Sequence, residues 1–131
     1  MSGRATPDGT NRRAAERPGY RALGSTGLTV SVVGFGGYRT GRNDPGHRSA
    51  LRAALAGGIN LIDTSSNYML GDSERLVGEV LAERLIPRDE VVVVTKIGYL
   101  QGPNLELALQ REAEGRPFPE MVKYAAGVWH C

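Results

Sequence analysis

The sequence predicts an α/β fold built on parallel strands, and three observations support this. Short apolar runs at 30–35, 59–63 and 91–94 have the length and β-branched content of strands. Two longer segments between them carry apolar residues at helical spacing. The run at 91–94 is apolar on both faces, which is typical of a strand in the middle of a parallel sheet. Strands that alternate with helices imply right-handed crossovers and therefore parallel pairing.

The composition is that of one small soluble globular domain. The 131 residues are 40% hydrophobic and 23% charged, and no apolar run approaches the roughly 18 residues of a membrane span. From residue 20 onward there are twelve basic and twelve acidic residues, so no basic surplus is left for nucleic acid. The single cysteine, Cys131, fits a reducing compartment. We therefore expect a cytoplasmic protein with neither nucleic-acid nor membrane partners.

The N-terminal third is expected to hold a leader, a hairpin and the first strand. Residues 1–19 mix Gly, Pro, Ser, Thr, Asn and Arg without apolar periodicity, so we expect a disordered leader. Order begins at Tyr20, with a hairpin that turns at 24–27 (Gly-Ser-Thr-Gly). The run at 30–35 is then expected to be one strand that opens into a glycine-rich loop at 34–37.

Two helices are expected between the strands. The first begins at Asp44-Pro45, an N-cap residue followed by proline, and ends at Gly57-Gly58. Asp72 and Ser73 are candidate N-caps of the second. The apolar stripe of the second helix consists of Leu76, Val77, Val80, Leu81 and Leu85. Beyond residue 98 the pattern weakens. A polar helix is possible at 105–114, and 99–131 as a whole is expected to be a loop or insertion.

Three polar residues stand where a parallel α/β fold places its active site, at the C-terminal ends of strands. Asp63 ends the second strand, Tyr68 follows it in the next loop, and Lys96 ends the third strand. A lysine after an apolar strand needs a partner, which Asp63 can provide, and a nearby cation stabilises a tyrosine phenolate. A phenol in that setting can donate its proton to a carbonyl oxygen. Each residue alone also has a structural explanation, respectively an Asx turn, a half-buried aromatic and a snorkelling side chain.

Taken together, these residues resemble the N-terminal part of the aldo-keto reductases, from Tyr20 to about Gly98. The matching segments are Tyr20-Arg-Ala-Leu-Gly-Ser-Thr-Gly-Leu-Thr-Val-Ser, Gly34-Phe-Gly-Gly, Ile62-Asp-Thr-Ser-Ser-Asn-Tyr68, Ser73-Glu-Arg-Leu-Val-Gly78 and Val94-Thr-Lys96. Asp-x₄-Tyr followed by Glu-x₃-Gly and then a strand ending in Thr-Lys is a specific combination. The chain departs from the family at Met69-Leu70, where a glycine is more usual after the tyrosine.

The resemblance implies the fold, the reaction and the roles of the site residues. The fold would be the N-terminal portion of a (β/α)₈ TIM barrel, namely the hairpin plus about three βα units. The reaction would be NAD(P)H-dependent reduction of an aldehyde or ketone to an alcohol, or the reverse, on a small carbonyl or sugar-like substrate. By motif position Tyr68 resembles the proton donor, Lys96 the cation that stabilises its phenolate, and Asp63 the partner of Lys96. The residues that resemble the nicotinamide end of an NADPH site, with NADH possible, are Gly36, Gly37, Tyr38 and Asp63.

A complete barrel of this kind takes about 250 residues, so we expect this chain to be an incomplete barrel, cut before the third helix and inactive by itself. The family's catalytic histidine is expected beyond residue 131. His130 follows Lys96 by 34 residues, but no helix-then-strand pattern leads to it, so we expect it to be dispensable. His130 and Cys131 do not make a metal site, because two adjacent ligands leave zinc half coordinated.

Three other interpretations remain open. A Rossmann half-domain would also begin with a strand, a glycine-rich loop and a helix, but Arg39 stands where its third glycine belongs and the helix begins late, near Asp44. A non-catalytic, cofactor-sensing relative of the same fold would keep the same residues. The chain could also be an inert remnant.

Overall fold

The computed structural model describes residues 3–119, 121–125 and 128–130. The chain divides into two units, Met1–Thr95 and Lys96–Cys131, which are described separately. The elements of the first unit are α1 (Pro7–Ala15), β1 (Tyr20–Ala22), β2 (Thr29–Ser31), β3 (Phe35–Gly36), α2 (Pro45–Ala56), β4 (Leu61–Asp63), the 3₁₀ turn η1 (Tyr68–Gly71), α3 (Asp72–Ala82), the 3₁₀ turn η2 (Arg88–Glu90) and β5 (Val92–Val94). Those of the second are α4 (Gly102–Ala113), β6 (Val122–Ala125) and β7 (Val128–His130).

The first unit is a mixed α/β structure around a three-stranded sheet in the order β3-β4-β5. Both pairings are parallel, as the alternation of strands and helices predicted. The central strand is β4, whereas β5, expected in the middle, lies at an edge of this sheet. The expectation for β5 was wrong because strand order here follows chain order, and no further described strand pairs with its outer side.

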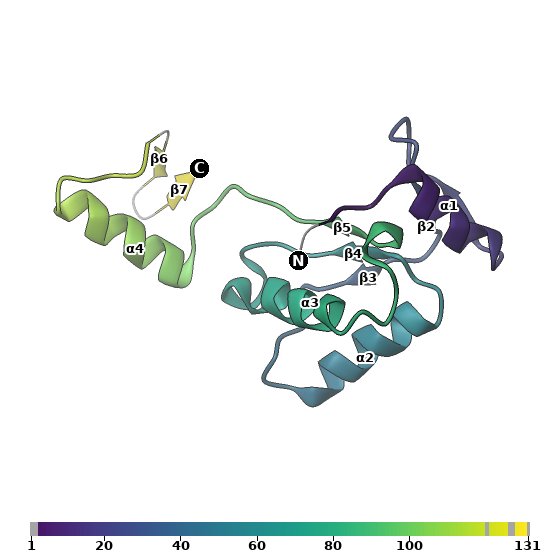
Figure 1. Cartoon of the computed structure of the whole chain (residues 1–131). Coiled ribbons are helices and arrows are strands. Elements are labelled where there is room, and N and C mark those ends of the chain that lie inside the picture. The colour runs from purple at the N-terminus through teal and green to yellow at the C-terminus, as the bar shows by residue number, and fades with distance from the viewer. Residues whose placement is uncertain (1–2, 120, 126–127, 131) are drawn as a thin grey trace. The chain divides into compact units, whose positions relative to one another are not determined.

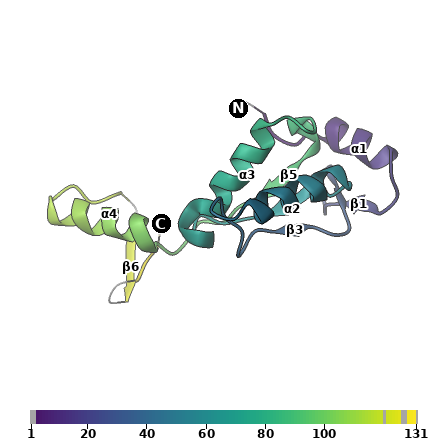
Figure 2. The same ribbon diagram turned by 90° about the horizontal axis from the view of Figure 1, so that it is seen from below.

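Helices α2 and α3 lie side by side against this sheet (Figure 1 and Figure 2). The ends of α2 agree with the sequence signals, because Asp44 caps its start and Gly57 follows its last residue. The sheet and the two helices together enclose one hydrophobic core. Its buried members are Leu51, Leu55, Ile62, Leu76, Val77, Val80 and Val91. Leu85, expected in the stripe of α3, lies after the end of that helix and is 46% exposed.

The apolar run at 30–35 is divided between two sheets, although one strand was expected. Val30 pairs in the antiparallel hairpin β1–β2, which confirms the predicted hairpin. Phe35 pairs with Ile62 in the parallel sheet. Between them Val32 and Val33 are 55% and 62% exposed. The valines at 30, 32 and 33 favour strand on both sides of the division, so local propensity does not show where the chain leaves one sheet for the other.

The leader was expected to be disordered, but residues 7–15 form α1. Thr6 caps the helix by accepting a hydrogen bond from the Gly9 amide at 3.0 Å. Thr10 is fully buried, and Arg13 is 7% exposed and donates to the Leu55 carbonyl. The helix packs on β2 and η2 through these polar groups (Figure 1). Apolar periodicity therefore gives no signal for α1, because polar contacts to distant parts of the chain order it.

The start of α3 also differs from its prediction. The N-cap position is Gly71, and no side chain caps the helix there. Asp72 and Ser73 lie in the first turn, and both side chains bind the loop that follows β3. The side-chain oxygens of Asp72 and Ser73 therefore bind partners elsewhere in the fold instead of capping the helix.

The second unit consists of α4 and a hairpin of β6 and β7, in a segment expected to be a loop or insertion. The loop expectation is wrong for residues 102–113, and the polar helix suggested at 105–114 begins slightly earlier. Ala108 is the buried apolar residue of α4, so the helix carries little hydrophobic patterning. None of the described helices is both long and apolar enough to cross a membrane.

Candidate active site

The candidate site begins with a row of residues at the C-terminal edge of the parallel sheet. Gly36, Asp63 and Val94 are neighbours across β3, β4 and β5. The ladder continues one residue further, because the Gly37 amide donates to the Asp63 carbonyl at 2.8 Å and the Thr64 amide donates to the Val94 carbonyl at 2.8 Å. Ile62 belongs to the helix-covered core, so alternation along β4 places Asp63 on the other face of the sheet.

The turn after β4 brings Tyr68 back to Asp63. The Tyr68 hydroxyl donates a long hydrogen bond, 3.5 Å, to the Asp63 carboxylate. Met69 and Leu70 then adopt left-handed backbone conformations, with φ of 50° and 55°. Residues other than glycine adopt this conformation at a cost of about 1–2 kcal/mol each. A glycine, which is usual after the tyrosine in the family that the sequence resembles, would avoid this cost at its position. The departure at Met69-Leu70 therefore adds backbone strain to this turn.

Tyr38 joins this group from the loop after β3. Its ring meets the Tyr68 ring edge-on, with centroids 5.2 Å apart and planes at 83°, a favourable geometry for two aromatic rings. Tyr38 is 66% exposed and follows Gly36 and Gly37 in the chain. A Cβ on Gly36 would meet nothing within 4 Å. A Cβ on Gly37 would lie 2.5 Å from the Ser73 hydroxyl, so Gly37 is a glycine because α3 approaches it closely.

A buried junction of hydroxyls fastens the two loops together. Ser73 is fully buried and donates to the Gly37 carbonyl at 2.9 Å. The Thr64 hydroxyl lies 2.9 Å from the same oxygen of Ser73. Because a hydroxyl carries one proton and Ser73 gives its own to Gly37, Thr64 is the donor of that second bond. The junction thus connects the loop after β3, the residue after Asp63 and the first turn of α3.

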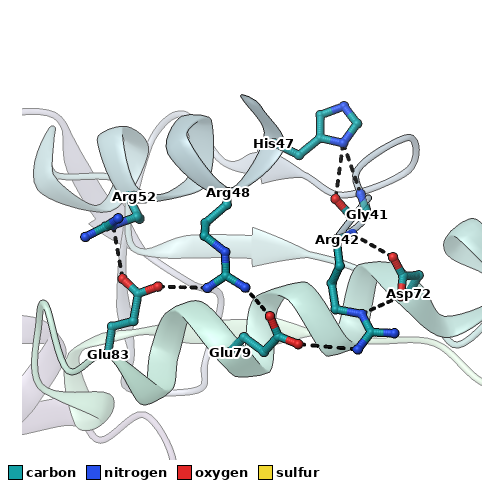
Figure 3. A network of polar contacts seen from close by, with 8 residues as sticks. All are labelled: Gly41, Arg42, His47, Arg48, Arg52, Asp72, Glu79 and Glu83. Atoms are coloured by element: carbon teal, nitrogen blue, oxygen red, sulfur yellow. Dashed lines mark hydrogen bonds and ion pairs between the residues drawn. The ribbon is translucent and has the colours of Figure 1, made fainter. Parts of the chain in front are cut away.

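A second attachment lies at the other end of the same loop (Figure 3). Arg42 donates its backbone amide to one oxygen of Asp72 and its Nε–H to the other, both at 2.6 Å. These bonds lower the pKa of the Asp72 carboxyl below its ordinary value, the backbone amide contributing most. A Cβ on Gly41 would lie 2.9 Å from Asp72, so this loop also approaches the helix closely. Neither attachment was predicted from the sequence. The glycines at 37 and 41 were the available signal, because each marks a close approach of the loop to α3.

The attachment continues into a row of ion pairs between the two helices (Figure 3). Arg42 also reaches Glu79 at 3.4 Å, and Arg48 of α2 pairs with Glu79 and with Glu83. Arg52 pairs with Glu83 at 3.0 Å. Most of these side chains are substantially exposed, so each pair contributes little stability by itself. As a row they keep α2 and α3 in one register.

The predicted site residues are therefore distributed as follows. Asp63 and Tyr68 lie together, and Gly36, Gly37 and Tyr38 border them from the neighbouring strand and loop. Lys96 is the first residue of the second unit, and its role stays a prediction. His130 lies in β7 of an antiparallel hairpin rather than in a parallel strand. Cys131 lies outside the described residues.

The N-terminus of α2 does not suit a Rossmann-type phosphate site. The Asp44 carboxylate accepts a hydrogen bond from the Gly46 amide at 2.7 Å and so occupies that end of the helix. A carboxylate at this position repels the anion that a dinucleotide fold would bind there. Within the described part of the chain, no three His, Cys, Asp or Glu side chains gather into a possible metal site.

Comparison with solved structures shows the class of protein to which this architecture belongs. The aldo-keto reductase AKR11C1 from Bacillus halodurans, in its holo form, aligns with a TM-score of 0.57 and 34% identity over 63% of this chain and 27% of that chain. The hairpin, parallel strands and covering helices are thus an α/β arrangement found in enzymes of the TIM-barrel class, and the likeness covers about two thirds of the chain.

Sequence comparison then shows the family. The model of the aldo/keto reductase family matches residues 32–117, and the chain belongs to this family. The 6-dehydroglucose reductase of Novosphingobium aromaticivorans is 37% identical over 92 residues, 63% of this chain and 30% of that protein. The L-galactose dehydrogenase of Arabidopsis thaliana is 32% identical over 117 residues, 85% of this chain and 37% of that protein. The chain thus spans about a third of their length. The family match extends to residue 117, whereas the resemblance in the sequence was traced only to about Gly98.

The described residues fit one end of a nicotinamide cofactor of the kind this family uses. Gly36 leaves open space at the C-terminal edge of β3, on the row that contains Asp63, and the exposed Tyr38 ring borders it. An exposed aromatic ring and a glycine at which even a Cβ would meet nothing leave room for a flat ring at this edge of the sheet. Groups for the phosphates and the adenosine are not provided by these residues.

Proposed function

We propose that this chain provides the proton-donating part of an NAD(P)H-dependent aldo-keto reductase. The observation that supports the proposal is the Tyr68 hydroxyl, which lies beside Asp63 at the C-terminal edge of a parallel sheet in a member of this family. Catalytic groups of TIM-barrel enzymes lie at that edge. The reaction would convert an aldehyde or ketone to an alcohol, or run in reverse.

Each site residue has a distinct task in this proposal. When bound, the dinucleotide supplies a hydride to the carbonyl carbon. Tyr68 hydrogen-bonds the carbonyl oxygen and transfers its phenolic proton to that oxygen, which becomes the alcohol. Lys96, assigned by family resemblance, stabilises the phenolate that remains, and Asp63 is the anionic partner of Lys96. Gly36, Gly37 and Tyr38 shape the space for the nicotinamide end.

The substrate we propose is a small carbonyl compound of sugar-like character. Two relatives of this chain are named for sugar substrates, 6-dehydroglucose and L-galactose. We propose NADPH as the cofactor, with NADH as the alternative, and a cytoplasmic location that fits the single cysteine. The catalytic histidine of the family is proposed to lie outside this chain, and His130 is proposed to be dispensable.

Substitution of Tyr68 by phenylalanine tests the central role. The experiment uses the completed protein, by which we mean this chain extended to the length of its relatives with its own downstream sequence or with the matching part of L-galactose dehydrogenase. We expect Tyr68→Phe to lower kcat by about 10²–10⁴-fold, the contribution of a general acid, with an unchanged dissociation constant for NADPH. His130→Ala is the control and should keep kcat within about twofold. Undiminished turnover in Tyr68→Phe would refute the proposal, and a parent that binds NADPH without turnover would indicate the cofactor-sensing relative.

The 131-residue chain by itself is not expected to bind NADPH tightly. Three parallel strands cannot close a barrel, and contacts at one end of a large flexible ligand rarely offset the cost of ordering it. Titration of the purified chain with NADPH, followed by nucleotide fluorescence, measures this directly. Saturable binding near 1 μM, about −8 kcal/mol, would show that these residues complete a cofactor site unaided.

A further inference from the structure

The loop that carries Tyr38 is held at both ends by consecutive residues of α3. Ser73 binds Gly37, the residue before Tyr38, and Asp72 binds Arg42, four residues after it. The amide of Thr40 closes the turn between these points by donating to the Gly37 carbonyl at 3.1 Å. The ring of Tyr38 therefore projects from a turn whose two ends are fixed to one helix.

That helix follows Tyr68 directly. The turn η1 runs from Tyr68 to Gly71, and α3 begins with Asp72. The residues that anchor the Tyr38 loop thus stand four and five positions after Tyr68. Any movement of the loop relative to α3 changes the edge-on contact between the two rings, because that contact joins the loop to the start of the helix.

The two anchors differ in strength and kind. Ser73 is fully buried, and its loss would remove one hydrogen bond from the Gly37 carbonyl and one from the Thr64 hydroxyl. The Asp72 side chain is 17% exposed and accepts two hydrogen bonds from Arg42, one from the backbone amide and one from Nε, so it binds both the backbone and the side chain of that residue. Ser73 thus fixes the start of the loop at Gly37, and Asp72 fixes its end at Arg42.

We propose that Asp72 and Ser73 are positioning residues for Tyr68: through Arg42 and Gly37 they hold the Tyr38 ring against the Tyr68 ring, which fixes the phenol in the direction from which it donates its proton. The inference rests on the proposed function for its catalytic consequence, but the ring contact itself is independent of activity. Misplacement of a reacting group by about 1 Å can cost 10²-fold in rate, so a positioning role has a measurable effect.

Asp72→Asn in the completed protein tests the proposal. Arg42 donates to both carboxylate oxygens, and asparagine replaces one of them by an NH₂ group that cannot accept. We expect kcat to fall ten- to hundredfold while the dissociation constant of NADPH changes less than twofold. Glu83→Gln is the matched control, because Glu83 is the C-cap residue of α3 and its ion pairs go to Arg48 and Arg52 of α2 and not to the Tyr38 loop. We expect Glu83→Gln to keep kcat within twofold at a similar melting temperature.

A double-mutant cycle separates positioning from simple destabilisation. If Asp72 acts through the ring of Tyr38, Tyr38→Ala should cause a similar loss, and the double variant should be no worse than Tyr38→Ala alone. Additive losses, an equal loss in Glu83→Gln, or a kcat within twofold of the parent in Asp72→Asn would overturn the proposal. Should Asp72→Asn fail to fold, Arg42→Gln removes the same Nε–H bond from the exposed side and carries the same expectations.

A measurement without turnover keeps this inference distinct from the proposed function. In the 131-residue chain with labelled tyrosines, NMR should show a nuclear Overhauser effect between the ring protons of Tyr38 and Tyr68. It should be lost in Asp72→Asn and kept in Glu83→Gln. If the completed parent is inactive but the nuclear Overhauser effect is lost in Asp72→Asn and kept in Glu83→Gln, the proposed function is refuted and the anchoring is supported. If the nuclear Overhauser effect is unchanged in Asp72→Asn, the anchoring is refuted, whatever the activity.

Discussion

The two ends of the parallel sheet in the first unit differ in how their polar groups are used. At the N-terminal end the side chain of Asn60 is fully buried, accepts from the Ser31 amide, and donates to the carbonyls of Thr29 and Glu90. Nearby, Arg13 and Arg17 donate to the last two carbonyls of α2, and the Tyr20 hydroxyl donates to the carbonyl of Gly58, just after that helix. At the C-terminal end, by contrast, Tyr38, Met69 and Leu70 are more than half exposed, and two of the three have left-handed backbones.

This difference fits the proposed function, in which the reacting groups lie at the C-terminal end and the N-terminal end holds the elements together. Buried polar side chains hold the hairpin, α1 and α2 together through hydrogen bonds, although the buried Nε of Arg13 has no hydrogen-bond partner among the described residues. Exposed aromatic groups and backbone strain persist only where the surroundings impose them, and such features gather at functional sites. Substitutions at the N-terminal end should therefore act mainly on stability, whereas those at the C-terminal end should act mainly on activity, and relief of backbone strain there should raise stability.

The largest stability effect is expected at the N-terminal end, for Arg13→Ala. Arg13 is 7% exposed, pairs with Glu90 at 3.5 Å and donates to the Leu55 carbonyl, so its removal takes away a buried hydrogen bond and the nearer of two arginine partners of Glu90, which Arg12 also approaches at 3.9 Å. We expect the free energy of unfolding to fall by about 1–3 kcal/mol, measured by urea titration and circular dichroism. Arg12→Ala is the control. Its ion pair to Asp89 is exposed, so the loss should be much smaller than in Arg13→Ala. Equal losses in the two variants would contradict the comparison.

At the C-terminal end, Met69→Gly should make the chain more stable. Met69 has a φ of 50°, and glycine adopts that conformation without the steric cost. We expect a gain of up to about 1 kcal/mol, reduced by the extra freedom of glycine in the unfolded chain. Gly71, with a φ of 84°, provides the reverse experiment, because Gly71→Ala adds strain and should destabilise. A stability loss in Met69→Gly would show that this side chain contributes packing that outweighs its strain.

The smallest effect is expected in the pH dependence of stability. The bonds from Arg42 lower the pKa of Asp72 in the folded chain, so its carboxyl binds protons less readily than in the unfolded chain, where carboxyl groups of this kind titrate near pH 4. The stability contributed by Asp72 is therefore present above about pH 4 and lost as the pH falls through the lower, folded-state value. The difference in unfolding free energy between the parent and Asp72→Asn, measured from pH 7 to pH 3, should shrink in this acidic range. A difference that is constant over the whole range would exclude this linkage.

The sequence by itself determined the parts of this protein that depend on local signals and on ordered motifs. Asp44-Pro45 and Gly57 mark the ends of α2, and the alternation of strands and helices predicts parallel pairing. The ordered motifs around Asp63 and Tyr68 indicated the family to which the chain belongs. Capping, periodicity and motif spacing are encoded within a few residues, so one sequence suffices to read them.

Only the tertiary structure decided the features whose partners are far apart in the chain. Helix α1 is ordered by η2, by β2 and by the end of α2, none of which its own polar sequence can indicate. Asp72 and Ser73 suit helix capping by their residue type, yet they bind Arg42 and Gly37, about thirty residues or more earlier in the chain. A hydroxyl or carboxylate oxygen accepts whichever donor the fold brings near, and local rules cannot foresee that donor. The contact of Tyr38 with Tyr68 has the same origin, because it exists only once β3 and β4 have paired.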